Sequence, residues 1–307
     1  MQGVLAGFVT LGAIIALGFL LAQFGVLRSD SQRLLTQLAF FVATPALLFQ
    51  TLSTAPVDQI FTSGLAVAAL SFVGAAGTYA LLARTVWRRS TGDTVLGALS
   101  SAYVNAGNLG LPITVYVLGS ATFIAPVLLM QLLLITPLAF AVLDAVVTKR
   151  RPSLWVLISQ PLRNPITVGS FLGLLCSLAD WQVPTLIASP IALIAGMAVP
   201  GVLLAYGVSL RLGPRPIAGG SVAELAVVCT LKLLVQPLLA YAVARWLFDL
   251  DGRALLAATV VAALPTAQNI FVYASRYNRS TTLARDSIFV TTALSVPVLL
   301  TITALLT

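Results

Sequence analysis

Residues 105–112 read NAGNLGLP, and residues 265–269 read PTAQN. Each run lies inside an apolar stretch that is otherwise long enough to span a membrane as a helix. Pro112 has no N–H to donate and clashes with the preceding turn, while Gly107 and Gly110 allow the backbone to unwind. Unwound backbone at membrane depth is tolerated only inside protein or against a water-filled cavity. Both runs therefore predict helix breaks in the interior of the protein.

The composition around these runs is that of a membrane protein. The 307 residues are 59% hydrophobic and only 8% charged, whereas soluble domains carry about 25% charged residues. So few charges cannot cover a water-exposed surface, so the main partner of the chain is the lipid bilayer. The net charge of +8 does not indicate nucleic acid, because the basic residues lie in short gaps between apolar stretches and form no continuous face.

Ten apolar stretches have the length of a spanning helix, and no stretch is left for a soluble domain. The first, Val4 to Val26, lacks a preceding basic segment and is too long for a signal peptide, so it is counted as a span. The ten predicted spans are 3–26, 32–53, 61–84, 94–118, 122–147, 163–180, 186–210, 219–246, 253–276 and 282–306.

The basic residues predict the orientation of these spans, because cytoplasmic loops carry an excess of Lys and Arg. The odd-numbered gaps hold most of them, whereas three of the four even-numbered gaps hold none. The basic loops are therefore expected in the cytoplasm and both termini outside. The basic residues of the odd-numbered gaps are Arg28, Arg33, Arg84, Arg88, Arg89, Lys149, Arg150, Arg151, Arg163, Arg211, Arg215, Arg276, Arg279 and Arg285.

Paired prolines predict an internal repeat. Pro45 and Pro200 are 155 residues apart, and Pro112 and Pro265 are 153 apart. A five-helix repeat, residues 1–147 and 163–307 with a cytoplasmic linker at 148–162, explains both separations. An odd number of spans per repeat inserts the two halves upside-down relative to each other, as in many secondary transporters. The alternative is a coincidence of four prolines that membrane helices tolerate.

If the two breaks meet near the midplane, two half-helix N-termini converge there. Their N–H groups and positive dipole ends favour an anion such as a carboxylate. The alternative is an ordinary proline kink whose polar residues face a neighbouring helix. The substrate-binding residues predicted from the breaks are Asn105, Gly107, Asn108, Gly110, Pro112, Pro265, Thr266, Gln268 and Asn269.

Most charged residues lie at the ends of the predicted spans, and three others are considered for a functional role. Lys232 is close to the centre of the eighth span, where a charge is costly and should face a cavity or a partner. It could attract an anionic substrate, titrate as a coupling group or act as a fixed cation; the alternative is a structural lysine held by backbone carbonyls. Asp144 and Glu224 lie within one or two turns of the cytoplasmic face. They are candidates for coupling groups or for structural roles.

Several absences restrict the chemistry. The chain has no His, which removes imidazole metal sites and histidine bases, and we expect no cofactor, no metal and no enzyme activity. Neither break contains an acidic residue, which disfavours a sodium site. The small polar residues Ser100, Ser101, Thr114, Thr266 and Gln268 leave weak sodium binding open. Cys176 and Cys229 lie in apolar stretches and are expected to be core residues.

The run from Asn105 to Pro112 and the run LPTAQNIFVYASRYN at 264–278 resemble the auxin efflux carrier family. The resemblance covers essentially the whole chain. It implies the fold shared with bile-acid sodium symporters and sodium/proton antiporters, an all-α membrane protein whose fourth and ninth spans are broken and cross. The implied substrates are small organic anions, such as auxin for plant members and malate or malonate for some bacterial ones. The short linker resembles bacterial members, which implies the bacterial inner membrane.

The resemblance also implies how the protein works. Spans 3–5 and 8–10 would form a transport domain that moves, elevator-like, against a scaffold of spans 1, 2, 6 and 7, through which a homodimer would also form. The substrate would lie between the breaks and residues near the scaffold, for which Phe49, Gln50, Gln131 and Tyr206 are the candidates. The function expected is secondary transport of organic anions; a sodium-coupled symporter of the bile-acid type is the alternative.

Overall fold

A computed structural model describes residues 2–54, 63–110, 113, 114, 118, 123–148, 165–212 and 220–306. Within these ranges the chain is helical, and its only β-type pairing is an isolated antiparallel bridge between Val104 and Thr266. Pro112 lies outside the described residues.

The first half of the chain contains long apolar helices and one interrupted one. The first broken helix consists of α5 (Thr91–Ala102), an extended segment and the π-helical turn η3 (Ala106–Gly110). The other elements of this half are α1 (Gln2–Gln23), α2 (Ser29–Leu38), η1 (Ala39–Ala43), α3 (Thr44–Ser53), α4 (Ser63–Thr85), α7 (Ala125–Leu129), η5 (Met130–Ile135) and α8 (Thr136–Thr148).

The second half repeats this pattern. Its broken helix consists of α15 (Gly252–Ala262) and α16 (Asn269–Tyr277), with a non-helical segment between them. The other elements are α10 (Pro165–Leu178), α11 (Thr185–Ala195), α12 (Ala198–Leu212), α13 (Val222–Thr230), η6 (Leu231–Val235), α14 (Gln236–Ala242), η7 (Val243–Leu247) and α17 (Thr281–Leu306).

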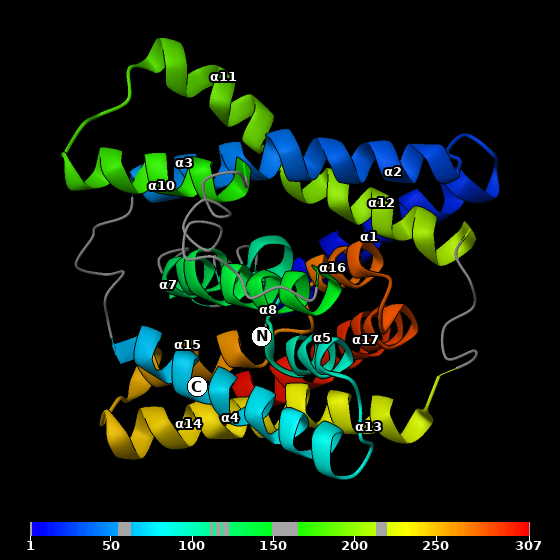
Figure 1. The fold of residues 1–307 in the computed structure, drawn as a ribbon. Helices are drawn as coiled ribbons and strands as arrows, with labels where there is room; N and C mark the ends of the chain where they lie inside the picture. The colour runs from blue at the N-terminus through cyan, green and yellow to red at the C-terminus, as the bar shows by residue number, and fades with distance from the viewer. Residues whose placement is uncertain are drawn as a thin grey trace.

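The helices form layers that mix the two halves of the chain (Figure 1). Helices α1, α2, α3, α10, α11 and α12 pack together on one side, while α4, α13, α14 and α15 lie on the other. Between them lie α5, α7, α8, α16 and α17 (Figure 1). The two broken helices therefore lie in and beside the middle of the molecule, where protein surrounds their interrupted backbone.

Glycines bring helices of the first layer into close contact. This layer is the group α1, α2, α3, α10, α11 and α12. A Cβ added at Gly207 of α12 would lie 2.1 Å from the Ile15 carbonyl oxygen of α1, and one at Gly18 would meet Leu204. A Cβ at Gly173 of α10 would lie 2.6 Å from the Phe49 carbonyl oxygen of α3. Small residues that allow backbones to approach are typical of helix pairs in lipid. The layer is thus held by backbone packing.

Six helical stretches are long and apolar enough to cross a membrane: 29–53, 63–85, 126–147, 185–212, 222–247 and 281–306. Three shorter apolar helices, Gly12–Gln23, Pro165–Leu178 and Gly252–Ala262, add to them. The chain is therefore a multi-pass helical membrane protein by length and composition. The predicted count of ten spans stays a prediction, because length and apolarity single out six.

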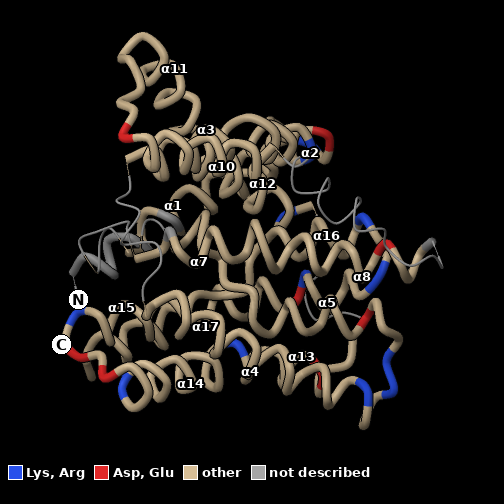
Figure 2. Tube along the Cα trace, turned by 60° about the vertical axis from the view of Figure 1, so that its left-hand side comes forward, with Lys and Arg blue, Asp and Glu red and all other residues tan. Residues whose placement is uncertain are grey.

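Charged residues lie mostly at the ends of the helices (Figure 2). Lys and Arg gather beside the starts of α5 and α13, at one end of the molecule (Figure 2). Three ion pairs lie there: Arg89 with Glu224, Arg279 with Asp93, and Arg285 with Asp286. The first two of these pairs cross-link segments that are far apart in sequence, whereas the third joins neighbouring residues of α17.

Candidate functional site

The first break begins where α5 ends at Ala102. Tyr103 takes an extended conformation (φ −80°, ψ 106°), and the chain becomes helical again only at η3. In the new turn, the N–H groups of Leu109 and Gly110 donate to the Asn105 carbonyl over 3.2 and 2.8 Å. The non-helical residues 103–105 therefore end at the first residue of the Asn- and Gly-rich run, and residues 106–110 of that run are helical.

The second break lies between Ala263 and Gln268. Helix α16 then begins with a tight first turn, in which the N–H groups of Ile270 and Phe271 donate to the carbonyls of Ala267 and Gln268. These two N–H groups are used inside the turn, so the N-terminus of α16 offers fewer free donors than a standard helix start.

The two breaks lie against each other in antiparallel direction. The Asn105 N–H donates to the Pro265 carbonyl over 2.8 Å, and the Ala267 N–H donates to the Tyr103 carbonyl over 3.0 Å. These bonds flank the bridge between Val104 and Thr266. Two short extended segments thus satisfy each other's backbone groups, which lipid could not do.

Side chains from surrounding helices satisfy the remaining carbonyls of the crossing. Gln131 of η5 donates to the Val104 carbonyl over 3.0 Å, and the Thr266 hydroxyl donates to the Ser100 carbonyl over 2.7 Å. Gln236 donates to the Ala102 carbonyl over 2.9 Å. The Thr266 N–H in turn donates to the hydroxyl of Thr291 in α17 over 3.1 Å. The end of α5 is therefore capped from outside its own helix.

Asn105 is the exception in this satisfied network. Its Oδ1 accepts from the Asn108 N–H over 3.3 Å, as an asparagine does at a helix start. Its Nδ2 is buried and has no hydrogen-bond partner among the residues that the structure describes, and Asn105 is only 2% exposed. A buried amide without an acceptor is costly, so this donor calls for an explanation. This donor belongs to the same side-chain amide of Asn105 whose oxygen caps η3.

The two breaks also contact each other through half-buried side chains. The Asn108 side chain donates to the Gln268 Oε1 over 3.4 Å, which links the two breaks through their side chains. Gly107, Asn108, Gln268 and Asn269 are partly exposed, whereas Gly110, Pro265 and Thr266 are buried. The crossing therefore presents amide groups from both breaks on its accessible side.

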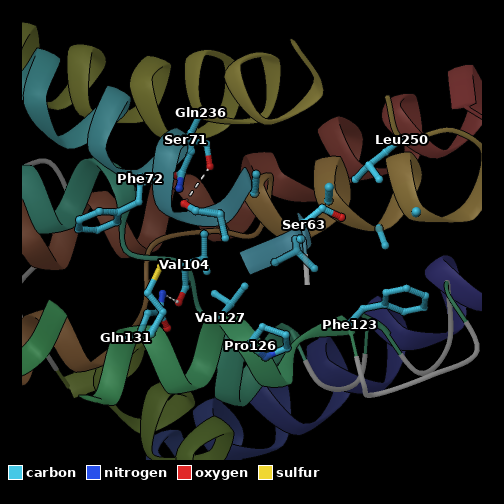
Figure 3. Close-up of a pocket in the computed structure, with 18 of the residues that line it drawn as sticks. Ser63, Ser71, Phe72, Val104, Phe123, Pro126, Val127, Gln131, Gln236 and Leu250 are labelled. Atoms are coloured by element: carbon cyan, nitrogen blue, oxygen red, sulfur yellow. Dashed lines mark hydrogen bonds between the residues drawn. The ribbon is translucent and has the colours of Figure 1, made fainter. Parts of the chain in front are cut away.

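A cavity of about 400 Å³ lies beside the first break (Figure 3). Its wall is mostly apolar, and it is formed by α4, α7, η5, α14 and α15 together with Val104. Polar groups reach it from Ser63, Ser71, Gln131 and Gln236. Of the residues predicted from sequence to bind substrate, only Gln131 lines this cavity, and there it is bonded to Val104 (Figure 3).

The predicted scaffold residues lie elsewhere. Gln50 of α3 is exposed and Phe49 is half-buried, and neither lines the cavity. Tyr206 of α12 is half-buried and interacts with the Thr292 hydroxyl of α17. Since α12 also contacts η3, Tyr206 lies on the helix that faces the first break from the first layer. The structure thus brings together the breaks and Gln131, but not Gln50.

Lys232 is fully buried, with 0% of its surface exposed. Its Nζ donates to the Gln236 Oε1 over 2.6 Å and to the Ala262 carbonyl over 2.7 Å. Ala262 is the last helical residue of α15, so the ammonium lies at the start of the second break. This central lysine therefore contacts the crossing directly.

The two predicted carboxylates lie at the polar end of the bundle instead. Glu224 is buried, is paired with Arg89, and accepts from the Tyr79 hydroxyl over 2.7 Å. The bond to Glu224 raises the pKa of the Arg89 guanidinium. Asp144 accepts from the Tyr277 hydroxyl over 2.7 Å. Neither carboxylate contacts the crossing through these bonds, so both link helices near their ends.

Two residues of the network were not singled out from the sequence. Gln236 lies four residues after Lys232, a spacing that places both on one face of a helix, and this was the available signal. Thr291 gives no comparable signal, because a threonine in an apolar helix usually bonds to its own preceding turn. Among the described residues, no group of three His, Cys, Asp or Glu could hold a metal ion.

Comparisons with known proteins agree with this architecture. A family model described as "Membrane transport protein" matches residues 4–303. A Rhizobium meliloti protein named "Putative malonate transporter" is 26% identical over 95% of this chain and 92% of its own length. An "Uncharacterized transporter" of Methanothermobacter thermautotrophicus is 26% identical over 92% of this chain and 91% of its own length. "Auxin efflux carrier component 4" of Arabidopsis thaliana is 30% identical over 45% of this chain and 23% of its own length.

Proposed function

The chain belongs to the family of membrane transport proteins that includes the auxin efflux carriers, and from this we propose that it carries small organic anions across the cell membrane. The proposal names carboxylates as the substrate class, with malonate-like dicarboxylates first among them. The Rhizobium meliloti relative, which is similar over most of both chains, is named for malonate, and this supports the order.

The observation that carries the proposal is the unpaired Nδ2 of Asn105. It is a buried donor at the crossing of the two broken helices, and a carboxylate oxygen would satisfy it. The amides of Asn108 and Gln268, which join the two breaks, would supply further donors once their mutual bond opens. Neither break contains an acidic residue that would repel an anion. An anion bound here would therefore gain hydrogen bonds that the empty protein lacks.

We further propose that ten spans form two inverted repeats, with α5–η3 and α15–α16 as the broken fourth and ninth spans. The antiparallel pairing of the two breaks supports this symmetry. The mutual packing of α1, α2, α3, α10, α11 and α12 supports a scaffold of spans 1, 2, 6 and 7. The remaining helices would move as one transport domain and expose the crossing to each side in turn.

The concentration of Lys and Arg beside the starts of α5 and α13 supports an orientation with this end in the cytoplasm and the termini outside (Figure 2). A negative-inside membrane potential would then favour export of an anion, at about 2.3 kcal/mol per charge for each 100 mV. Uniport is therefore sufficient for export, and uptake requires a coupling gradient.

The test is transport by purified protein in proteoliposomes. Mono- and dicarboxylates are offered as labelled substrates, with imposed sodium, proton or potassium gradients, and empty liposomes serve as the control. We expect saturable exchange of at least one dicarboxylate, competed by its unlabelled form. If no carboxylate is exchanged or raises the thermal unfolding midpoint, the anion proposal is wrong.

A further inference from the structure

The buried side chain of Lys232 donates hydrogen bonds to two oxygen atoms of the described residues. Its two hydrogen-bond acceptors are the Gln236 Oε1 at 2.6 Å and the Ala262 carbonyl oxygen at 2.7 Å. Both oxygens are uncharged. Within the described ranges, every ion pair uses an arginine: Arg89, Arg245, Arg279 and Arg285. The positive charge of Lys232 is therefore not balanced by an ion pair in this part of the chain.

Two helix ends supply the missing negative charge. Ala262 is the last residue of α15, and its carbonyl is at the negative end of that helix dipole. Gln236 accepts from Lys232 and donates to the carbonyl of Ala102, the last residue of α5. Each C-terminal helix end carries roughly half a negative charge, so two of them balance about one ammonium.

This arrangement has the ligand chemistry of a bound cation. In carriers with broken helices, sodium ions are held by unwound carbonyls and by the C-terminal ends of half-helices. A backbone carbonyl and a side-chain amide oxygen, as provided by Ala262 and Gln236, are ligands of this kind. In this protein the side chain of Lys232, which comes from η6, bonds to these two oxygens itself. The lysine thus occupies the position in which a separate ion would bind.

We propose that Lys232 is a built-in cation that takes the place of a coupling sodium ion at the crossing, so that transport does not depend on sodium. The inference rests on the proposed transport function, which it deepens by assigning the coupling. Lys232 is a positioning residue in this account: it holds the two helix ends at the crossing and does not contact the substrate.

The experiment compares three forms of the full chain. Lys232→Ala removes the ammonium and leaves space, whereas Lys232→Met removes the charge but fills the space. Each form is measured in choline, sodium and methylammonium chloride, by thermal unfolding in detergent and by carboxylate exchange in proteoliposomes. Choline is too large for the space left by the side chain and serves as the reference cation.

We expect wild-type exchange to be equal in sodium and choline. Lys232→Ala should lose stability and exchange in choline, and methylammonium should raise its unfolding midpoint and recover its exchange by about tenfold. Lys232→Met should respond to no cation. A merely structural lysine would lower stability in both variants without any response to a cation.

The inference is overturned if wild-type exchange requires sodium. It is also overturned if Lys232→Ala responds to small cations no more than Lys232→Met does, or folds in none of the three salts. If no carboxylate is exchanged by the wild type, the proposed function fails. The cation dependence of the unfolding midpoint still decides the role of Lys232 in that case.

Discussion

The two helix breaks cross each other, yet different kinds of side chain satisfy the free backbone groups of each break. At the second break, Ala263–Gln268, Lys232 of η6 donates to the last carbonyl of the preceding helix α15. The Thr266 N–H of this break donates to the hydroxyl of Thr291. The first break, at Tyr103–Gly110, is held by the neutral amides of Gln131 and Gln236, and one of its buried donors has no partner in the described part of the chain. We propose from this difference that the second break is a structural joint, while a ligand completes the hydrogen bonding of the first.

The largest effect should come from reversing the chemistry of the first break. Asn105→Asp keeps the oxygen that caps η3 but replaces the unpaired donor by an acceptor that repels a carboxylate. We expect carboxylate exchange in proteoliposomes to fall by roughly 100-fold, about 2.7 kcal/mol of lost transition-state stabilisation.

Asn278→Asp is the matched control for this change. Asn278 caps α16 in the left-handed conformation (φ 50°), which aspartate also adopts, and it is exposed. Its exchange rate should stay close to that of the wild type. Equal losses in the two variants would mean that charge as such, and not the position at the crossing, is responsible.

A substitution at the second break should change the stability of the protein more than its preference among carboxylates. Thr291→Val removes the hydroxyl that accepts from the buried Thr266 N–H, and an unpaired buried donor costs about 1–3 kcal/mol. The unfolding midpoint in detergent should fall, while the order of preference among carboxylates should stay the same. Thr301→Val is the control, because the Thr301 hydroxyl is exposed and bonds only within its own helix.

A smaller effect is expected where the first break packs against its neighbours. A Cβ at Gly110 would lie 2.8 Å from Ile124 Cδ1 and 2.9 Å from Leu264 Cδ1, so Gly110→Ala forces two side chains to shift. Overpacking of this kind costs typically about 1–3 kcal/mol, and we expect the lower end because both atoms are the ends of flexible side chains. Gly107→Ala is the control, since its Cβ would meet only Leu128 at 3.9 Å.

The smallest effect is expected at the contact between the accessible amides. The bond from Asn108 to Gln268 is long, at 3.4 Å, and both residues are half-buried. Gln268→Leu should weaken carboxylate exchange by about fivefold through loss of a donor, with little change in the unfolding midpoint. If exchange falls as far as in Asn105→Asp, the two breaks contribute equally to binding and the distinction between them is wrong.

Much of the fold follows from the sequence because proline and glycine act locally. The runs at 105–112 and 265–269 predict interrupted helices, and both interruptions are present in the described residues. The pairing of the two breaks with each other depends on packing between distant parts of the chain. The sequence indicates this pairing only through the internal repeat that the paired prolines predict. The ten-span count and the scaffold division remain predictions, because helix lengths alone mark six spans.

The site was predicted less completely, for identifiable reasons. Asn105 was predicted because its amide lies in the Asn- and Gly-rich run, and the structure places it where the two breaks pair; its role in binding stays a prediction. Lys232 was recognised as a central charge, but its partners could not be assigned, since backbone carbonyls such as that of Ala262 carry no sequence signal. Gln50 was expected near the substrate by its place after Pro45, and it is exposed on α3 away from the cavity.

The central claim is that the unpaired Asn105 amide binds the carboxylate of the substrate. The most direct measurement is malonate exchange by wild type and Asn105→Ala, reconstituted at equal amounts of folded protein in the membrane. The account predicts saturable exchange by the wild type and exchange near that of empty liposomes for the variant, with an unfolding midpoint that malonate raises only in the wild type. Exchange by Asn105→Ala at the wild-type rate would contradict it.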